Sequence, residues 1–303
     1  MKVLLVVGLI VCAAVAQADD LVVTILGSGG GPPTNTRRYG PSTLVQAAGE
    51  TLLFDAGRGA AFRLAEAKIP FVSKIFLTHL HSDHIFSIPD LWLTPWPVRR
   101  DHPLEIWGPA GTAAMMANLE KAYEFDIHIR RDVDEKFPAI AVEVKATDVT
   151  EGVIYDNGGL KVTVFDVDHR PIKPAFGYRI DYDGHSVVIS GDTRKSDNLI
   201  KFSEGVDVLI HEVYAADPKK APNVAVATVV AAHHTTALEA GEVFAAVKPQ
   251  LAVYSHIVPA RLPEAALAAL PSITAQTYEG TVIVGDDLMR IEIGDEVKVI
   301  AGR

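Results

Sequence analysis

Short apolar runs recur along the chain, and most of them end at a polar residue or a glycine. β-Branched and aromatic residues are frequent in these runs, which is typical of buried strands. The pattern predicts strands at residues 21–26, 42–46, 51–54, 74–78, 139–145, 160–167, 176–182, 185–190, 207–210 and 251–256. Helices are predicted at residues 58–68, 110–125 and 236–247. Strands and helices in this order indicate an α/β protein.

The first eighteen residues have a different pattern. Lys2 precedes an apolar stretch at residues 3–15, and residues 16–18 form an Ala-Gln-Ala cleavage sequence. This predicts a secretory signal peptide at residues 1–18 and a periplasmic or secreted protein made of one domain at residues 19–303. An uncleaved membrane anchor is the alternative, but the apolar stretch is short for a bilayer.

Composition and charge exclude several kinds of chemistry. Cys12 is the only cysteine and lies in the predicted signal peptide, so the mature chain has no disulfide, no cysteine nucleophile and no thiolate ligand for a metal. Lipid attachment at Cys12 is not expected either, because the residue before it is Val11 and not the small residue that such a site requires. The formal net charge of −10 makes the chain a poor non-specific binder of nucleic acid. No second long apolar run follows the signal peptide, so no membrane contact is expected after its cleavage.

The most informative stretch follows the predicted strand at residues 74–78. His79, His81, Asp83 and His84 fall within six consecutive residues. Neutral imidazole and carboxylate are the nitrogen and oxygen ligands that zinc prefers. Alternate residues of an extended chain point to the same side, so His79 and His81 can share one metal while Asp83 and His84 reach a second. A solvated histidine-rich turn is the alternative.

Further strand ends carry residues that can bind a metal or move a proton. They are His169 after residues 160–167, Asp192 within Ser-Gly-Asp-Thr after residues 185–190, His211-Glu212 after residues 207–210, and His256 at the end of residues 251–256. His233-His234 precedes a helix for which Thr236 and Glu239 form a capping box. Each residue alone could be an ordinary loop residue, but α/β proteins place their ligands at the carboxyl ends of strands.

Together these motifs resemble those of a known family. H-x-H-x-D-H is similar to the signature of the metallo-β-lactamase fold superfamily, and the Ser-Gly-Asp-Thr, His-Glu and His-Thr motifs resemble its ribonuclease Z-like, arylsulfatase-like branch. The resemblance implies a four-layer αβ/βα sandwich with metals at one edge between two sheets. It also implies the ligands: His79, His81 and His169 for one Zn²⁺, Asp83, His84 and His256 for a second Zn²⁺, and Asp192 as the bridge between them.

The same resemblance implies a hydrolytic mechanism. Two Zn²⁺ ions that share a solvent molecule lower its pKa enough to produce hydroxide near neutral pH. His234 would protonate the leaving oxygen, oriented by Glu212, and Asp83 can accept a proton from the attacking water. A structural role for His234 at the helix start is the alternative. Asp55 either orients a ligand histidine or forms a turn. His81 stands where diiron flavoprotein relatives usually carry a carboxylate, which favours zinc hydrolysis over oxygen chemistry.

Two departures from ribonuclease Z argue against tRNA as a partner. In the P-x-K-x-R-N loop of that family, Asn35 replaces the lysine and Arg38 replaces the asparagine. A tRNA-gripping arm lies in the part of the family's chain that follows His169, but here the strand at residues 176–182 begins almost at once. A small-molecule ester is therefore the expected substrate, and formation of a homodimer stays open.

Three functional hypotheses follow from the sequence. The first is a secreted dizinc hydrolase that cleaves phosphodiester or sulfate esters by metal-activated hydroxide. The second is a dizinc lactonase or a β-lactamase-like hydrolase. Asp192 argues against the β-lactamases, which lack a bridging carboxylate, and the loops of Glu212 and His234 favour the first hypothesis over a lactonase. The third is a non-catalytic zinc-binding protein, which a complete ligand set and an apparent general acid disfavour.

Overall fold

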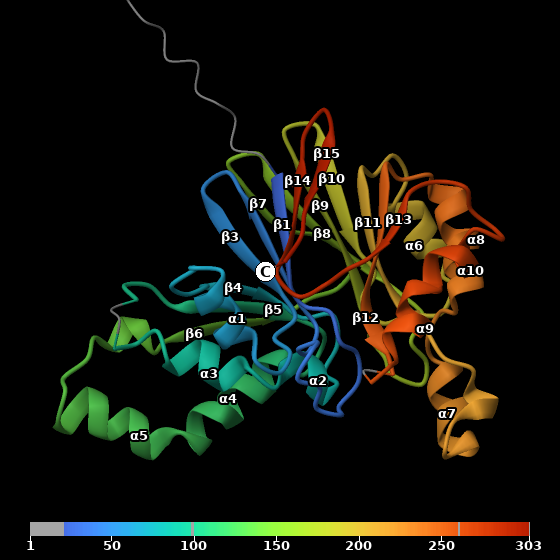
Figure 1. Ribbon diagram of the computed structural model, residues 1–303. Helices are drawn as coiled ribbons and strands as arrows, with labels where there is room; N and C mark the ends of the chain where they lie inside the picture. Colours follow the sequence, from blue (N-terminus) through green and yellow to red (C-terminus); the bar gives the residue numbers. More distant parts are fainter. Residues whose placement is uncertain (1–20, 98–99, 260, 303) are drawn as a thin grey trace, which may run out of the picture.

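The computed structural model describes residues 21–97, 100–259 and 261–302, and the predicted signal peptide lies outside this part of the chain. Two sheets pack face to face at the centre, with helices on both outer sides (Figure 1). The arrangement confirms the predicted four-layer α/β sandwich. Among the described residues, no helix has both the length and the apolarity needed to span a bilayer.

The first sheet contains eight strands in the order β15-β14-β1-β2-β3-β4-β5-β6. These strands are β1 (Leu21–Gly27), β2 (Ser42–Ala47), β3 (Glu50–Phe54), β4 (Lys74–Phe76), β5 (Leu104–Gly108), β6 (Val144–Asp148), β14 (Met289–Ile293) and β15 (Val297–Ile300). Strands β3 to β6 pair in parallel, whereas the other neighbours in this sheet are antiparallel.

The second sheet contains seven strands in the order β13-β12-β11-β10-β9-β8-β7. These strands are β7 (Gly152–Asn157), β8 (Leu160–Asp166), β9 (Phe176–Tyr182), β10 (His185–Ile189), β11 (Val208–Tyr214), β12 (Leu251–Val258) and β13 (Val282–Val284). Strands β10 to β13 are parallel, so their carboxyl ends lie at one edge of the sheet. The carboxyl-terminal parts of these strands, together with the loops that follow, carry the residues that the sequence singled out on this sheet: Asp192 lies in a loop, whereas His211 and Glu212 lie within β11 and His256 within β12.

Helices flank each sheet on its outer side (Figure 1). The first half contributes α1 (Ala60–Glu66), α2 (Ser82–Ile85), α3 (Ile88–Leu93), α4 (Thr112–Ala122), α5 (Glu124–His128), the π-helix η1 (Ile129–Val133) and the 3₁₀ turn η2 (Ala139–Ala141). The second half contributes α6 (Asp197–Phe202), the 3₁₀ turn η3 (Pro218–Lys220), α7 (Val224–Ala231), α8 (Ala237–Val247), α9 (Glu264–Ala268) and α10 (Leu270–Thr274). Of these, α7 projects away from the body of the molecule.

The apolar runs are continuous because both faces of the central strands are buried. In β3, Leu52 and Phe54 point into the core between the sheets, whereas Leu53 packs in the core beneath the helices of the first half. Side chains alternate along a strand, so one apolar run fills two cores. Trp92 and Trp96 are fully buried in the core beneath the helices.

Several regions differ from the sequence predictions. The prediction of a strand at residues 139–145 was wrong in its first half, where η2 precedes β6. Carbonyl groups of this segment accept hydrogen bonds from side chains instead of a neighbouring strand: Trp92 Nε1 donates to Val142 at 2.8 Å and Trp96 Nε1 to Pro138 at 3.0 Å. The predicted helix at residues 110–125 is divided into α4 and α5, and neither β7 nor α7 was predicted.

Candidate metal centre

Seven side chains that the sequence singled out converge between the two sheets. Four of them, His79, His81, Asp83 and His84, lie on the β4–α2 segment of the first half, with Asp83 and His84 inside the single turn of α2. The other three are His169 after β8, Asp192 after β10 and His256 on β12. Their donor atoms form two groups, and within each group all of them lie within 4.8 Å of one another. Asp192 belongs to the first group and also contacts His84 and His256 of the second.

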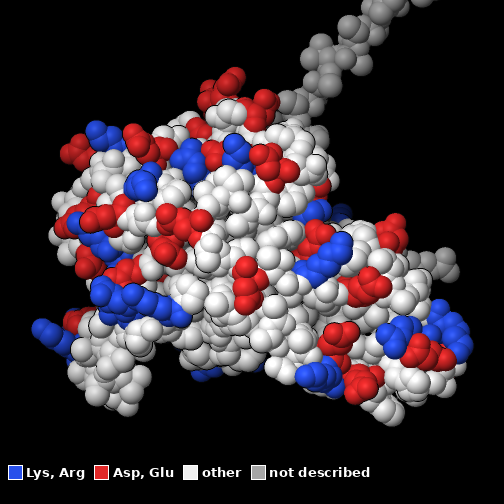
Figure 2. Space-filling model, turned by 180° about the vertical axis from the view of Figure 1, so that it is seen from behind, with Lys and Arg blue, Asp and Glu red and all other residues white. Residues whose placement is uncertain are grey.

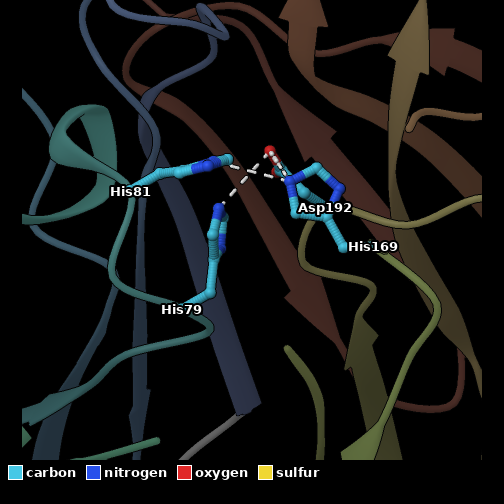
Figure 3. A group of neighbouring side chains, drawn as sticks. All are labelled: His79, His81, His169 and Asp192. Carbon is cyan, nitrogen blue, oxygen red and sulfur yellow. Dashed lines mark hydrogen bonds and ion pairs between the residues drawn. The ribbon is translucent and has the colours of Figure 1, made fainter. Parts of the chain in front are cut away.

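The first group consists of His79, His81, His169 and Asp192. Figure 3 shows the three imidazoles arranged around the carboxylate. Oδ2 of Asp192 lies 3.8 Å from Nε2 of His79 and 3.8 Å from Nε2 of His169. Nε2 of His169 is 3.5 Å from Nδ1 of His81. Three ring nitrogens and one carboxylate oxygen therefore point at a common volume.

The second group consists of Asp83, His84 and His256, joined by Oδ1 of Asp192. Nε2 of His84 lies 3.1 Å from Nε2 of His256 and 3.6 Å from Oδ2 of Asp83. Oδ1 of Asp192 lies 3.4 Å and 3.2 Å from the same two imidazole nitrogens. Ligands about 2.0–2.2 Å from a tetrahedral zinc are about 3.3–3.6 Å apart, so this spacing fits one ion.

The hydrogen bonding of these atoms also fits a metal. Nε2 of His79 and Oδ1 of Asp192 are buried and have no hydrogen-bond partner among the described residues. A buried polar atom without a partner is costly, and a cation supplies the missing interaction. Burial lowers the pKa of His169 to about 4, which favours the neutral imidazole that binds a metal. Imidazole and carboxylate donors without thiolate suit zinc.

The outer nitrogens of the ligand histidines are held in place by other groups. Nδ1 of His84 donates to Oδ2 of Asp55 at 2.7 Å, and Oδ1 of Asp55 accepts from the backbone N–H of Thr78 at 2.8 Å. Nδ1 of His169 donates to the carbonyl of His233 at 3.0 Å. These contacts leave the inner nitrogens facing the cluster. Asp55 therefore orients His84, a candidate ligand, which matches one of its two predicted roles, whereas the carbonyl of His233 was not anticipated.

Three carboxylates gather around His84. Burial lowers the pKa of its imidazole, but Asp192, Asp55 and Asp83 together raise the pKa well above its ordinary value. The concentration of negative charge around one imidazole is a further feature that a bound cation would balance.

The glycine-rich loop after β1 lies against the cluster and contacts one of its carboxylates. The backbone N–H of Gly31 donates to Oδ2 of Asp83 at 2.9 Å. A Cβ atom at Gly30 would lie only 2.7 Å from Nδ1 of His256, so the loop can approach the cluster only with glycine there. Arg38 anchors this loop, because its buried guanidinium donates to Ser28 Oγ at 2.7 Å and to the carbonyl of Gly285 at 2.5 Å. The loop thus positions a ligand, a role that sequence reasoning missed.

His234 and Glu212 lie beside the cluster. Nδ1 of His234 is 3.2 Å from Oε2 of Glu212, and a ring nitrogen of His234 lies within 4.8 Å of donor atoms of Asp192 and His256. The backbone N–H of Thr235 donates to Oε1 of Glu212 at 2.9 Å, which fixes this carboxylate. Burial lowers the pKa of His234, but Glu212 outweighs it and raises the pKa to about 9. His234 therefore carries a proton at neutral pH next to the cluster.

Three other histidines stand apart from the cluster. His102 is partly exposed and His128 is exposed, and each pairs with a nearby aspartate, Asp101 and Asp132 respectively. His211 is fully buried, and its Nδ1 donates to the carbonyl of Glu212 at 2.7 Å. Among the described residues, none of these three belongs to a group of side chains that could hold a metal.

Comparisons with known proteins agree with this geometry. The family profile described as "Beta-lactamase superfamily domain" matches residues 50–257. Ribonuclease Z of Mycolicibacterium gilvum (strain PYR-GCK) is 36% identical over 279 residues, an alignment that covers 89% of this chain and 96% of the relative. Among solved structures, the metallo-β-lactamase fold protein YhfI from Bacillus subtilis has a TM-score of 0.69 at 21% identity, covering 90% of this chain and 99% of that one. The short form of human tRNase Z has a TM-score of 0.66 at 23% identity with the same coverage.

Proposed function

We propose that this chain, which belongs to the metallo-β-lactamase superfamily and is a hydrolase homologous to ribonuclease Z, binds two Zn²⁺ ions and cleaves phosphodiester bonds. One observation carries the proposal: two groups of side chains that can bind a metal share Asp192, and His234, 3.2 Å from Glu212, lies beside them. The homology to ribonuclease Z favours a phosphodiester among the esters that such a site can cleave.

Each residue has a defined task in this reaction. When bound, the metal pair activates a water molecule and withdraws electron density from the ester. Asp192 holds the two halves of the ligand set in a fixed relation, and Asp55 keeps His84 turned toward the cluster. Asp83 accepts a proton from the attacking water. His234, held by Glu212, donates its proton to the oxygen of the leaving group.

A small phosphodiester is proposed as the substrate instead of precursor tRNA. Strand β8 ends at Asp166 and β9 begins at Phe176, so the connection that carries His169 has no arm with which to grip a large RNA. Arg38, which replaces the asparagine of the ribonuclease Z loop, is buried and engaged with protein groups. The net charge of −10 also opposes non-specific binding of RNA.

The decisive experiment compares substrates with one zinc-loaded preparation. Turnover of bis(p-nitrophenyl) phosphate would be measured beside p-nitrophenyl sulfate, an acyl-homoserine lactone and a precursor tRNA, after elemental analysis for zinc. We expect two zinc ions per chain and the highest kcat/KM for the phosphodiester. Preference for the sulfate ester or the lactone would replace the proposed substrate class, and bound zinc without any turnover would favour the non-catalytic alternative.

Export is proposed from the amino-terminal sequence. The signal peptide predicted at residues 1–18 would direct the chain to the periplasm or the medium. The proposed reaction is compatible with these oxidising surroundings, because it uses no reduced thiol. Mass spectrometry of the exported protein should find an amino terminus at Asp19. Recovery of the protein only in the cytoplasm with its first eighteen residues intact would contradict the proposal.

A further inference from the structure

Helix α7 is apolar on every side, yet none of its residues is buried. Its sequence contains Thr228 and otherwise only valine and alanine. Val224, Val226 and Val229 are 46%, 57% and 59% exposed. A helix that is apolar all round is normally covered by other groups. In Figure 2, where the molecule is seen from behind, the lobe at the lower left that contains this helix is largely white.

One side of α7 continues the wall of the metal centre. Val230 lines a cavity of about 170 Å³ together with His81, His169 and other residues of the cluster. Val226 and Val229 precede Val230 by four residues and one, so all three lie within one side of the helix. We call these three residues the valine stripe. It extends the apolar part of the cavity wall outward from the metal ligands.

The helix that carries the valine stripe is capped at its start and hydrogen-bonded to the rest of the protein at its middle and its end. Asn223 caps its first turn by accepting a hydrogen bond from the backbone N–H of Val226 at 3.2 Å. The hydroxyl of Tyr214 donates to the carbonyl of Ala227 at 3.3 Å, and the Arg194 side chain donates to the carbonyl of Ala232. The stripe is therefore a positioned surface and not a chance exposure of a loop.

The chemistry of the stripe limits what can cover it. Helix α7 has no charged side chain, so a polyanionic RNA backbone finds no partner on the stripe itself. Charges lie beside it: Arg170 and Arg194 pair with Asp168, and η3, which packs against α7, carries Lys219 and Lys220, the latter paired with Asp217. Three valines expose on the order of 200–300 Å², well below the roughly 800 Å² that each partner contributes to a stable protein interface. A small apolar group fits both the size and the lack of charge.

We propose that the substrate is an amphiphilic ester, with its charged phosphodiester at the metal cluster and its alkyl or aryl group on the valine stripe. This inference rests on the proposed phosphodiesterase function and specifies its substrate class. Because Val230 belongs to both the cavity and the stripe, a single extended molecule can contact the ligand residues and α7 together. Each methylene group buried on the stripe should strengthen transition-state binding by up to about fourfold.

The test uses two substrates with the same leaving group, methyl p-nitrophenyl phosphate and octyl p-nitrophenyl phosphate. The zinc-loaded wild-type protein should prefer the octyl ester in kcat/KM by about tenfold or more. The double variant Val226→Ser/Val229→Ser should lose this preference while its zinc content and its rate on the methyl ester stay unchanged. Val224→Ser is the matched control, because Val224 is exposed on the opposite side of the same helix, and it should keep the preference.

Binding of octylphosphonate and methylphosphonate to the zinc-loaded protein separates this inference from the proposed function. Tighter binding of octylphosphonate that the double variant loses would support the stripe even if neither diester were hydrolysed, and only the proposed function would then fail. Equal turnover of the two esters or equal binding of the two phosphonates by the wild type would overturn the inference. It would also be overturned by a dimer, detected in sedimentation, that the double variant converts to a monomer, since the stripe would then belong to a second copy.

Discussion

Asp192 is the residue on which the two halves of the ligand set depend. Its Oδ2 faces His79 and His169, whereas its Oδ1 faces His84 and His256. The side chain is 3% exposed, so neither oxygen can be satisfied by bulk water. In the proposed dizinc site, one carboxylate would thus contribute a negative charge and a donor atom to each metal position.

Replacement of Asp192 by alanine should therefore weaken both positions at once. We expect the zinc content of Asp192→Ala to fall from two ions per chain to one or fewer after dialysis, with activity lost by more than about a hundredfold. Elemental analysis measures the first effect. Asp101→Ala is the control and should keep both ions. Asp101 is highly exposed, and its ion-pair partner is His102, which lies outside the cluster. An Asp192→Ala protein with full zinc content and activity would refute the bridging role.

His234 lies beside the candidate ligands Asp192 and His256, and its own partner is a carboxylate. As Nδ1 of His84 faces Asp55, so Nδ1 of His234 faces Glu212, and this carboxylate raises the pKa of His234 to about 9. A protonated imidazole is a poor ligand for a metal and a suitable general acid.

His234→Ala should consequently keep both zinc ions and lose activity in a way that depends on the leaving group. Hydrolysis of alkyl phosphodiesters, whose oxygen must be protonated as it leaves, should slow by a factor of about a hundred or more. Nitrophenyl esters should slow much less, because nitrophenolate departs without a proton. The measurement compares the hydrolysis rates of the wild type and the variant on each of the two ester types. Equal losses would indicate a structural or binding role, and loss of zinc would place His234 among the ligands.

At the scale of elements, the capping box of α8 supports the loop that carries His234. The Thr236 side chain and the backbone N–H of Glu239 pair at 3.4 Å, and the Glu239 side chain accepts from the backbone N–H of Thr236 at 2.9 Å. The carbonyl of Thr235 accepts a hydrogen bond from Tyr214 N at 2.8 Å, so the start of α8 is also tied to β11. The capping box was predicted from the spacing of Thr236 and Glu239, and the structure confirms it.

Thr236→Ala removes one half of this box and should lower the free energy of unfolding by about 1 kcal/mol. Urea titration followed by circular dichroism measures the change. Thr228→Ala in the exposed middle of α7 is a matched control that should change stability by less than about 0.5 kcal/mol, because its hydroxyl bonds only to Val224 of its own helix. Equal effects of the two substitutions would mean that the cap contributes nothing specific.

The sequence predicted those helices and strands in which the apolar positions of the pattern are also the buried positions of the structure. The runs that became β1, β4, β11 and β12 are largely buried on both faces, so their apolar residues could be recognised in the sequence. The predicted ends of two of them were wrong, because β11 continues to Tyr214 and β12 to Val258, past the polar residues at which the apolar run stops. The half-exposed β7 and the uncovered α7 lack that contrast between buried and exposed positions.

For the candidate site, the individual residues could be predicted from the sequence, but the spacing along the chain did not show how they group. Each ligand residue could be identified at a strand end, but their grouping came only from the resemblance to a family, because spacing along the chain does not state which strand ends meet. The carbonyl of His233 and the N–H of Gly31 escaped prediction for a further reason. They act through the backbone, and any residue type offers the same backbone groups.

At the scale of the whole molecule, the metal centre joins the two halves of the sandwich. His79, His81, Asp83 and His84 come from the first half, whereas His169, Asp192 and His256 come from the second. Bound ions would connect side chains across the junction between the sheets at its open edge. Their removal leaves Asp55, Asp83 and Asp192 crowded around His84 without a cation to balance them.

Chelation should therefore destabilise the whole domain and not only abolish activity. Ligand binding to the native state at a hundred times its dissociation constant adds about 2.7 kcal/mol, so stripping zinc should lower Tm by at least about 5 °C. Differential scanning calorimetry before and after treatment with a chelator measures the shift, and re-addition of zinc should restore it. Asp192→Ala supplies the comparison: its Tm should respond much less to the chelator, since it holds less metal at the outset. A wild-type Tm that is identical with and without chelator, despite confirmed loss of zinc, would show that the two sheets need no metal to stay together.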